Sequence, residues 1–123
     1  MMHPEKFSLS SRIRSFRYAI AGIINFVRQE HNARIHAVAT VSVVIAGIVF
    51  HVSYLEAAAL AVVTGMVWIT EMLNTCLERM ADVTHPAFHP TIKFIKDLAA
   101  GAVLVAAITA VVVALFIFIP KFL

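Results

Sequence analysis

The chain has 123 residues, of which 61% are hydrophobic and 14% charged, with a formal net charge of +3 and a mean hydropathy of +0.89. Soluble proteins are usually about 45–50% apolar, so this composition excludes an ordinary soluble domain and indicates an all-α membrane protein. Basic residues beside apolar segments usually set membrane orientation, which argues against nucleic acid as a partner. The single cysteine, Cys76, excludes an internal disulfide.

The first segment, residues 7–28, combines arginines with apolar residues that recur every three or four positions. This pattern predicts an amphipathic helix in the membrane interface, with Ser10 or Ser11 as its cap. Such a helix serves either as a plain membrane anchor or as one wall of a site. The polar start shows no apolar core followed by a small-residue cleavage site, so we expect no cleaved signal peptide.

Three later segments are apolar and long enough to cross a hydrocarbon core of about 30 Å, which takes about 20 helical residues. We expect transmembrane helices over residues 35–53, 55–80 and 98–119, with a surface loop at 81–97 that leads into a short helix. Lysine and arginine concentrate before the first span and after the second. The positive-inside rule therefore places the N-terminus and the 81–97 loop in the cytoplasm. The whole chain is predicted to form a single membrane-embedded domain.

The second span ends in polar residues that share one helix face. At about 100° per residue, Glu71, Asn74, Glu78 and Asp82 fall within a sector of about 80°. A charged group in a bilayer costs about 2.5–3.5 kcal/mol, so such groups usually pair, bind an ion or do chemistry. Glu71 and Glu78 are about 10.5 Å apart along the helix. This spacing suits a metal at Glu78 and a reacting group at Glu71; the structural alternative is hydrogen bonding between helices.

Three other charged residues could complete a site with this stripe. Glu30 could pair with Arg34 as an interface charge, or join Glu78 in an oxygen-rich site suited to Mg²⁺. Lys96 could be a topology signal or could neutralise a phosphate, and Asp97 could cap the third span.

His85 and His89 are four residues apart, a spacing that can form a zinc pair on a helix. Pro86 and Pro90 oppose a continuous helix here, and no third ligand is apparent, so polar contacts to a nucleotide are favoured over zinc. The sequence carries neither a P-loop nor the protein-kinase motifs, so any use of ATP must depend on metal ions and side chains.

Two segments of the chain resemble known motifs. Glu71-Met-Leu-Asn74-Thr-Cys-Leu-Glu78 and Lys96-Asp97-Leu-Ala-Ala-Gly-Ala-Val are similar to the E-x-x-N-[ST]-x-x-E and K-D-x-[GA]-[SA]-[GA]-A-V motifs of bacterial integral-membrane diacylglycerol and undecaprenol kinases. The likeness covers residues 7–119. The segment Asn32-Ala-Arg34-Ile-His36 is more similar to the undecaprenol branch.

This resemblance implies a homotrimer in the bacterial cytoplasmic membrane, with active sites shared between neighbouring subunits. The implied reaction transfers the γ-phosphate of MgATP to the hydroxyl of a lipid alcohol, diacylglycerol or undecaprenol, in phospholipid or cell-envelope lipid recycling. Glu71 would be the base that contacts the substrate hydroxyl, supported by Asn74, and Glu30 and Glu78 would bind Mg²⁺. The residues implied in ATP binding are Arg12, Tyr18, Glu30, Glu78, Ala87, Phe88, His89, Lys96 and Asp97.

Two functions without catalysis compete with a lipid kinase. A small oligomeric proton or cation conductor would explain Glu71 and Glu78, but not their combination with Glu30, Lys96 and the basic first helix. A holin-like pore would not need a charged stripe. Consumption of ATP by the purified protein when a lipid alcohol is added distinguishes the kinase from both.

Overall fold

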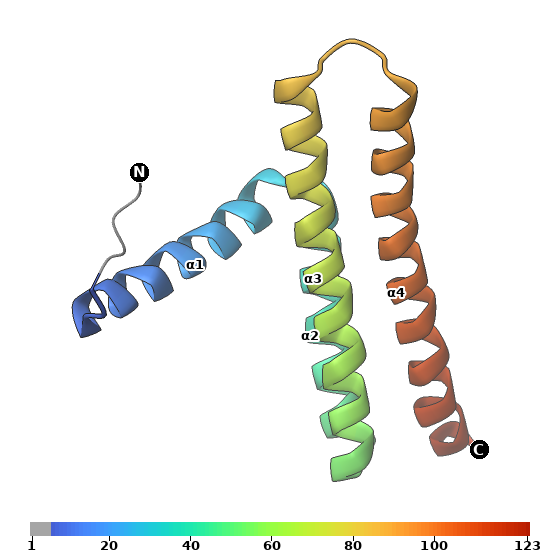
Figure 1. Ribbon diagram of the computed structural model, residues 1–123. Helices are drawn as coiled ribbons and strands as arrows, with labels where there is room; N and C mark the ends of the chain where they lie inside the picture. The colour runs from blue at the N-terminus through green and yellow to red at the C-terminus, as the bar shows by residue number, and fades with distance from the viewer. Residues whose placement is uncertain (1–5) are drawn as a thin grey trace.

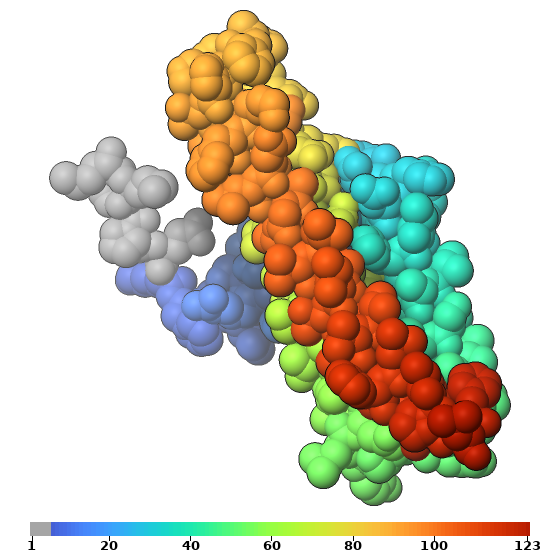
Figure 2. Space-filling model, turned by 90° about the vertical axis from the view of Figure 1, so that its right-hand side faces the viewer, coloured from blue at the N-terminus to red at the C-terminus, as the bar shows by residue number. Residues whose placement is uncertain are grey.

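The computed structural model describes residues 6–123 as four α-helices joined by short connections (Figure 1). They are α1 (Leu9–Gln29), α2 (His31–Val49), α3 (Tyr54–Thr84) and α4 (Pro90–Phe122). Helix α3 packs most extensively against α4 and also contacts α2, whereas α1 leaves this bundle at an angle. Figure 2 shows α4 across the near face of the molecule, with α1 on one side of it and α2 on the other.

Helices α2, α3 and α4 are each long and apolar enough to cross a membrane. This confirms the all-helical fold and the expected three helices of spanning length and composition. Few of their residues are buried within the single chain; the buried apolar residues are Ala33, Leu60, Val63, Val67, Ala81, Ala106 and Ile117. The remaining apolar side chains need lipid or further helices to cover them, since exposed apolar surface of this extent is unusual in a soluble monomer.

The connection between α3 and α4 is much shorter than the loop predicted at 81–97. Residues 81–84 continue α3 and residues 90–97 already belong to α4, so only His85–His89 lies outside the two helices. His89 caps α4, since its Nδ1 accepts the backbone N–H of Thr91 at 3.1 Å. Pro90 occupies the first turn, where a helix needs no backbone N–H from it. The prolines therefore mark a helix start, and Asp97 lies inside α4 instead of capping it.

The other helix ends also differ from the expected boundaries. Ser8, and neither Ser10 nor Ser11, caps α1 by accepting the Ser11 backbone N–H at 3.1 Å. Glu30 has an extended backbone that separates α1 from α2, so α2 begins at His31, four residues before the expected span. It also ends earlier, at Val49, and His51 turns the chain in the left-handed region with φ of 53°. The helical state of α1 is confirmed, while its place in the membrane interface stays a prediction.

Candidate functional site

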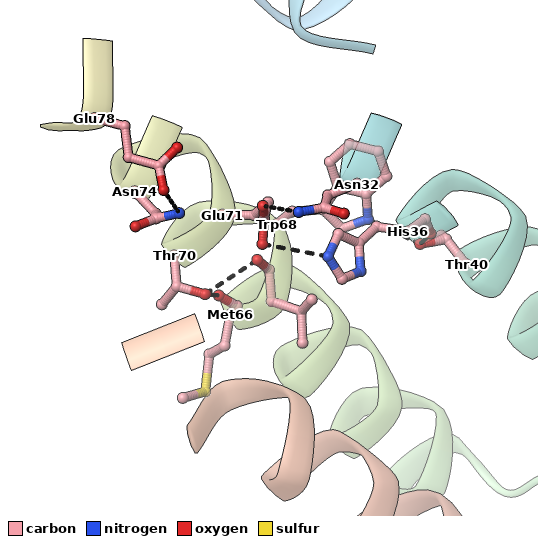
Figure 3. A network of polar contacts seen from close by, with 10 residues as sticks. Asn32, His36, Thr40, Met66, Trp68, Thr70, Glu71, Asn74 and Glu78 are labelled. Atoms are coloured by element: carbon pink, nitrogen blue, oxygen red, sulfur yellow. Dashed lines mark hydrogen bonds and ion pairs between the residues drawn. The ribbon is translucent and has the colours of Figure 1, made fainter. Parts of the chain in front are cut away.

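Glu71 is the deepest member of the polar stripe on α3 and is buried, with 5% of its surface exposed. Its Oε1 accepts from Asn32 Nδ2 at 3.5 Å, and its Oε2 lies 3.4 Å from His36 Nε2. Figure 3 shows that Asn32 and His36 both point from α2 toward this carboxylate. Hydrogen bonds between nitrogen and oxygen are usually 2.7–3.2 Å long, so these two contacts are long. The Glu71 carboxylate is thus enclosed but loosely held.

Asn74 lies one turn further along α3 and is also buried. Its Nδ2 donates to Glu78 Oε1 at 3.3 Å, so the structure places this amide against Glu78, whereas we expected it to support Glu71 (Figure 3). Within the described residues, Asn74 Oδ1 is buried without a hydrogen-bond partner. A buried acceptor left unpaired costs about 1–3 kcal/mol. This oxygen is therefore suited to receive a donor from outside the single chain.

Arg79 ties the junction of α1 and α2 to α3. Its Nη1 donates to Gln29 Oε1 at 2.8 Å, and its Nη2 forms an ion pair with Glu30 Oε1. Glu30 is paired with this distant arginine instead of with Arg34, its expected neighbour on the helix. Since Arg79 directly follows Glu78, the contact brings Glu30 to the level of Glu78 along α3.

Lys96 joins α4 to the next turn of the stripe. Its Nζ lies 2.9 Å from Asp82 Oδ1, and the two side chains are 37% and 67% exposed. Lys93 pairs with Asp97 along the surface of α4. Lys96 and Asp97 are therefore both within reach of a water-soluble ligand, and each already has a partner of opposite charge.

The other residues implied in ATP binding lie in two separate places. Arg12 and Tyr18 are exposed on α1, the helix that diverges from the bundle in Figure 1. The segment Ala87–His89 is exposed in the connection before α4. Over residues 6–123, no group of three or more His, Cys, Asp or Glu side chains is placed to hold a metal ion. The chain thus carries Glu71, Asn74 and Glu78 along α3 and ties Glu30 to the neighbouring Arg79, and these described residues do not close a metal cage.

Asn32 and His36 received no chemical role from the sequence. The available signal was their spacing of four residues on a mostly apolar helix, which places two polar side chains on one face. That spacing does not say which helix the face meets. The structure shows that it meets α3 at Glu71.

The fold and the site together define a membrane protein with a buried carboxylate between its spanning helices. A family model described as "Prokaryotic diacylglycerol kinase" matches residues 17–118. A protein of Synechocystis sp. named diacylglycerol kinase is 42% identical over 110 residues, which cover 89% of this chain but 63% of that protein. The undecaprenol kinase of Bacillus subtilis is 36% identical over 113 residues, 92% of each chain. The chain belongs to the prokaryotic diacylglycerol kinase family.

Membership of this family confirms the resemblance that the two motifs indicated, and both motifs lie within the matched residues. The two relatives bear the names of kinases with lipid alcohol acceptors, so the family is one of phosphotransferases that act on lipids. These names give no support to the alternative of a small ion conductor. The chain spans less than two thirds of the length of the Synechocystis protein and almost all of the length of the Bacillus protein.

Proposed function

We propose that this protein transfers the γ-phosphate of MgATP to the hydroxyl of a membrane lipid alcohol, with diacylglycerol and undecaprenol as the candidate acceptors. The observation that carries the proposal is the state of Glu71. This carboxylate is buried on an apolar helix, and within residues 6–123 no lysine or arginine pairs with it. Ionisable residues inside a membrane are expensive and usually functional. A buried carboxylate near a bilayer boundary suits a base for a lipid hydroxyl.

In the proposed reaction, the lipid hydroxyl oxygen attacks the γ-phosphorus while Glu71 accepts the hydroxyl proton. The bond between the γ-phosphorus and the bridging oxygen of the β-phosphate breaks, and ADP leaves with the bonding electrons. The lipid approaches sideways from the bilayer, whereas ATP comes from water at the cytoplasmic surface. The reacting atoms therefore meet at the boundary between the two, with the N-terminus and the α3–α4 connection on the cytoplasmic side.

The donors around Glu78 fit a magnesium ion that arrives with ATP. Mg²⁺ keeps several waters and usually takes one or two protein carboxylates together with phosphate oxygens. Glu78 is half-buried, Glu30 is held at the same level by Arg79, and Asn74 Oδ1 is free to accept from a water or a substrate hydroxyl. A closed cage of three side chains is not needed, because the phosphates supply the other ligands. The ion would shield the charge of the phosphates during transfer.

Lys96 and Asp97 would contact the nucleotide from α4, and Arg12, Tyr18 and the segment Ala87–His89 would complete its site. In one chain α1 diverges from the bundle that carries Lys96. A homotrimer, in which α1 of one subunit approaches α3 and α4 of its neighbour, would bring these groups together. The extensive exposed apolar surface of the single chain supports such an assembly in the bacterial inner membrane, with α1 in the interface.

The test is a side-by-side assay of purified protein in mild detergent with γ-labelled ATP, Mg²⁺ and either diacylglycerol or undecaprenol. We expect labelled lipid phosphate from at least one acceptor, and none from the Glu71→Gln variant or from a lipid without a hydroxyl. Absence of labelled product with both acceptors would refute the kinase function. Mass measurement on the active sample tests the trimer, and an active sample containing only monomer would contradict it.

A further inference from the structure

The surroundings of Glu71 contain a polar pair that the proposed reaction does not use. Asn32 and His36 are one turn apart on α2, and each contacts a different oxygen of the carboxylate. Beyond Arg34, the polar side chains of α2 are His36, Thr40 and Ser42. The Ser42 hydroxyl donates a hydrogen bond to the backbone carbonyl oxygen of Val38 at 2.8 Å. His36 is the polar residue of this apolar stretch that faces a carboxylate.

A purely structural role would be served by shorter contacts, and the same helix pair provides an example. One turn along α2, Thr40 Oγ1 accepts from Trp68 Nε1 at 2.8 Å, which joins α2 to α3 without touching Glu71. The contacts to Glu71 are 3.4 and 3.5 Å long. Hydrogen bonds around reacting groups are often long before substrate binds and shorten in the complex. The contacts to Glu71 therefore fit a side chain that is oriented by its neighbours better than a short structural hydrogen bond between helices.

The number of donors is also informative. A carboxylate has about four acceptor positions on its two oxygens. Asn32 Nδ2 occupies one position on Oε1, and His36 Nε2 occupies one on Oε2. Each oxygen keeps a free lone pair that can take a proton from a hydroxyl. These two contacts restrict rotation of the carboxylate, and neither comes from a lysine or arginine, which would be a permanent positive partner.

We propose that His36, with Asn32 as its auxiliary, is a positioning residue that orients the Glu71 carboxylate for removal of the proton from the lipid hydroxyl. The inference rests on the proposed function, in which Glu71 is the base. Misplacement of a reacting group by about 1 Å can lower a rate by about 10²-fold. Loss of His36 should therefore reduce turnover while leaving ATP binding unchanged, because His36 acts only through Glu71.

The experiment compares His36→Leu, His36→Gln, Asn32→Ala and Thr40→Val in purified protein of confirmed oligomer mass, with kcat and the KM values for ATP and lipid measured for each. His36→Leu should lower kcat by about 10–100-fold with the KM for ATP within about twofold of the parent. His36→Gln supplies an N–H near the same position and should recover most of the loss. Asn32→Ala should cost about tenfold or less, as expected for one long hydrogen bond to a charged group. Thr40→Val removes the contact with Trp68 and the hydrogen bond from the Thr40 hydroxyl to the His36 backbone carbonyl oxygen, but neither contact to the Glu71 carboxylate, so it should keep kcat within about twofold.

A double variant decides whether His36 acts through the base. In the Glu71→Gln background, His36→Leu should lower the residual turnover by about twofold at most, since residues that work as one unit are not additive. An equal loss of kcat on His36→Leu in the parental and Glu71→Gln backgrounds would overturn the inference. A parental kcat in folded His36→Leu would also overturn it, and so would an equal loss of kcat in His36→Leu and His36→Gln. If His36→Leu does not fold, the test uses Asn32→Ala, His36→Gln and the double variant His36→Gln/Asn32→Ala. A parental kcat in all three would overturn the inference. Parental turnover of Glu71→Gln itself would instead refute the proposed base, and this inference with it.

Discussion

Helix α3 carries three glutamates, and two of them, Glu56 and Glu71, are held in different ways. Near its N-terminal end, Glu56 Oε1 accepts from the Ser53 backbone N–H at 2.9 Å and from Lys121 Nζ at 3.0 Å. The Ser53 hydroxyl accepts in return from the Glu56 backbone N–H, which completes a capping box. Glu71 contacts His36 at 3.4 Å and Asn32 at 3.5 Å, and it takes part in no such cap.

Under the proposed function, this comparison separates a structural carboxylate, Glu56, from the proposed base, Glu71. Glu56 begins a helix and links α3 to the last turn of α4, at the same end where Phe50 packs against Phe118 and Phe122. A carboxylate with a lysine and a backbone N–H on one oxygen is stabilised as an anion and is a poor proton acceptor. Glu71 is more deeply buried, and among the described residues its contacts are longer and include no lysine or arginine.

The largest expected effect tests this distinction directly. Glu71→Gln keeps the size and hydrogen-bonding capacity of the side chain but cannot accept a proton at neutral pH. Turnover should fall by about 10²–10⁴-fold, the scale of general-base catalysis, with little change in the KM for ATP. The matched variant, Glu56→Gln, should keep parental turnover because it is at the other end of α3.

The measurement is kcat together with oligomer mass on one preparation of each variant. A folded Glu71→Gln protein of parental mass and near-parental kcat would end the case for Glu71 as the base. Weakened assembly with unchanged activity per folded protein would show instead that Glu71 is a structural contact like Glu56.

The second prediction concerns the Mg²⁺ concentration that activity requires, which we expect to depend on Glu30 and Glu78. Glu30→Gln and Glu78→Gln should each raise the Mg²⁺ concentration for half-maximal activity by about tenfold or more, since supporting contacts at metal sites have effects of this scale. Arg79→Gln removes the partner that holds Glu30 but no carboxylate, so it should raise the requirement less than Glu30→Gln does. Magnesium titrations of activity check all three, and parental magnesium dependence in both glutamate variants would exclude them as ligands.

A third, smaller effect should distinguish the roles of Lys96 and Asp82, which form the ion pair between α4 and α3. Lys96→Gln should raise the KM for ATP by about tenfold, the equivalent of one hydrogen bond to a charged group. Asp82→Asn should not raise it, because Lys96 then keeps its charge for the phosphate. Steady-state kinetics with varied ATP measure both, and equal increases in the two variants would show that the intact ion pair, and not the lysine alone, matters.

The smallest effect belongs to the structural end of α3. Ser53→Ala removes the hydroxyl that caps the helix and should lower stability by about 1 kcal/mol, with no change in turnover. Thermal unfolding in detergent, with kcat measured in parallel, checks the prediction. A lower kcat in a Ser53→Ala protein of unchanged thermal stability would mean that the cap at the N-terminal end of α3 affects the site at Glu71.

The sequence by itself determined the class of protein, the three spans and the face of α3 that carries Glu71, Asn74 and Glu78. These are local properties, because hydropathy over about 20 residues fixes a span and a fixed rotation per residue fixes a helix face. The two motifs also indicated the family that the comparisons confirm. The loop at 81–97 was overestimated because Pro90, with His89 as a cap, begins a helix that hydropathy alone placed later.

Only the tertiary structure decided which side chains meet across helices. The spacing of Asn32 and His36 defines a face of α2, but the rotation and axial offset of α2 against α3 decide that this face contacts Glu71. Likewise, Glu30 pairs with Arg79, 49 positions away, instead of with a neighbour four residues along. Packing of whole helix surfaces sets these offsets. Contacts between distant segments therefore cannot be obtained from the periodicity of either helix alone.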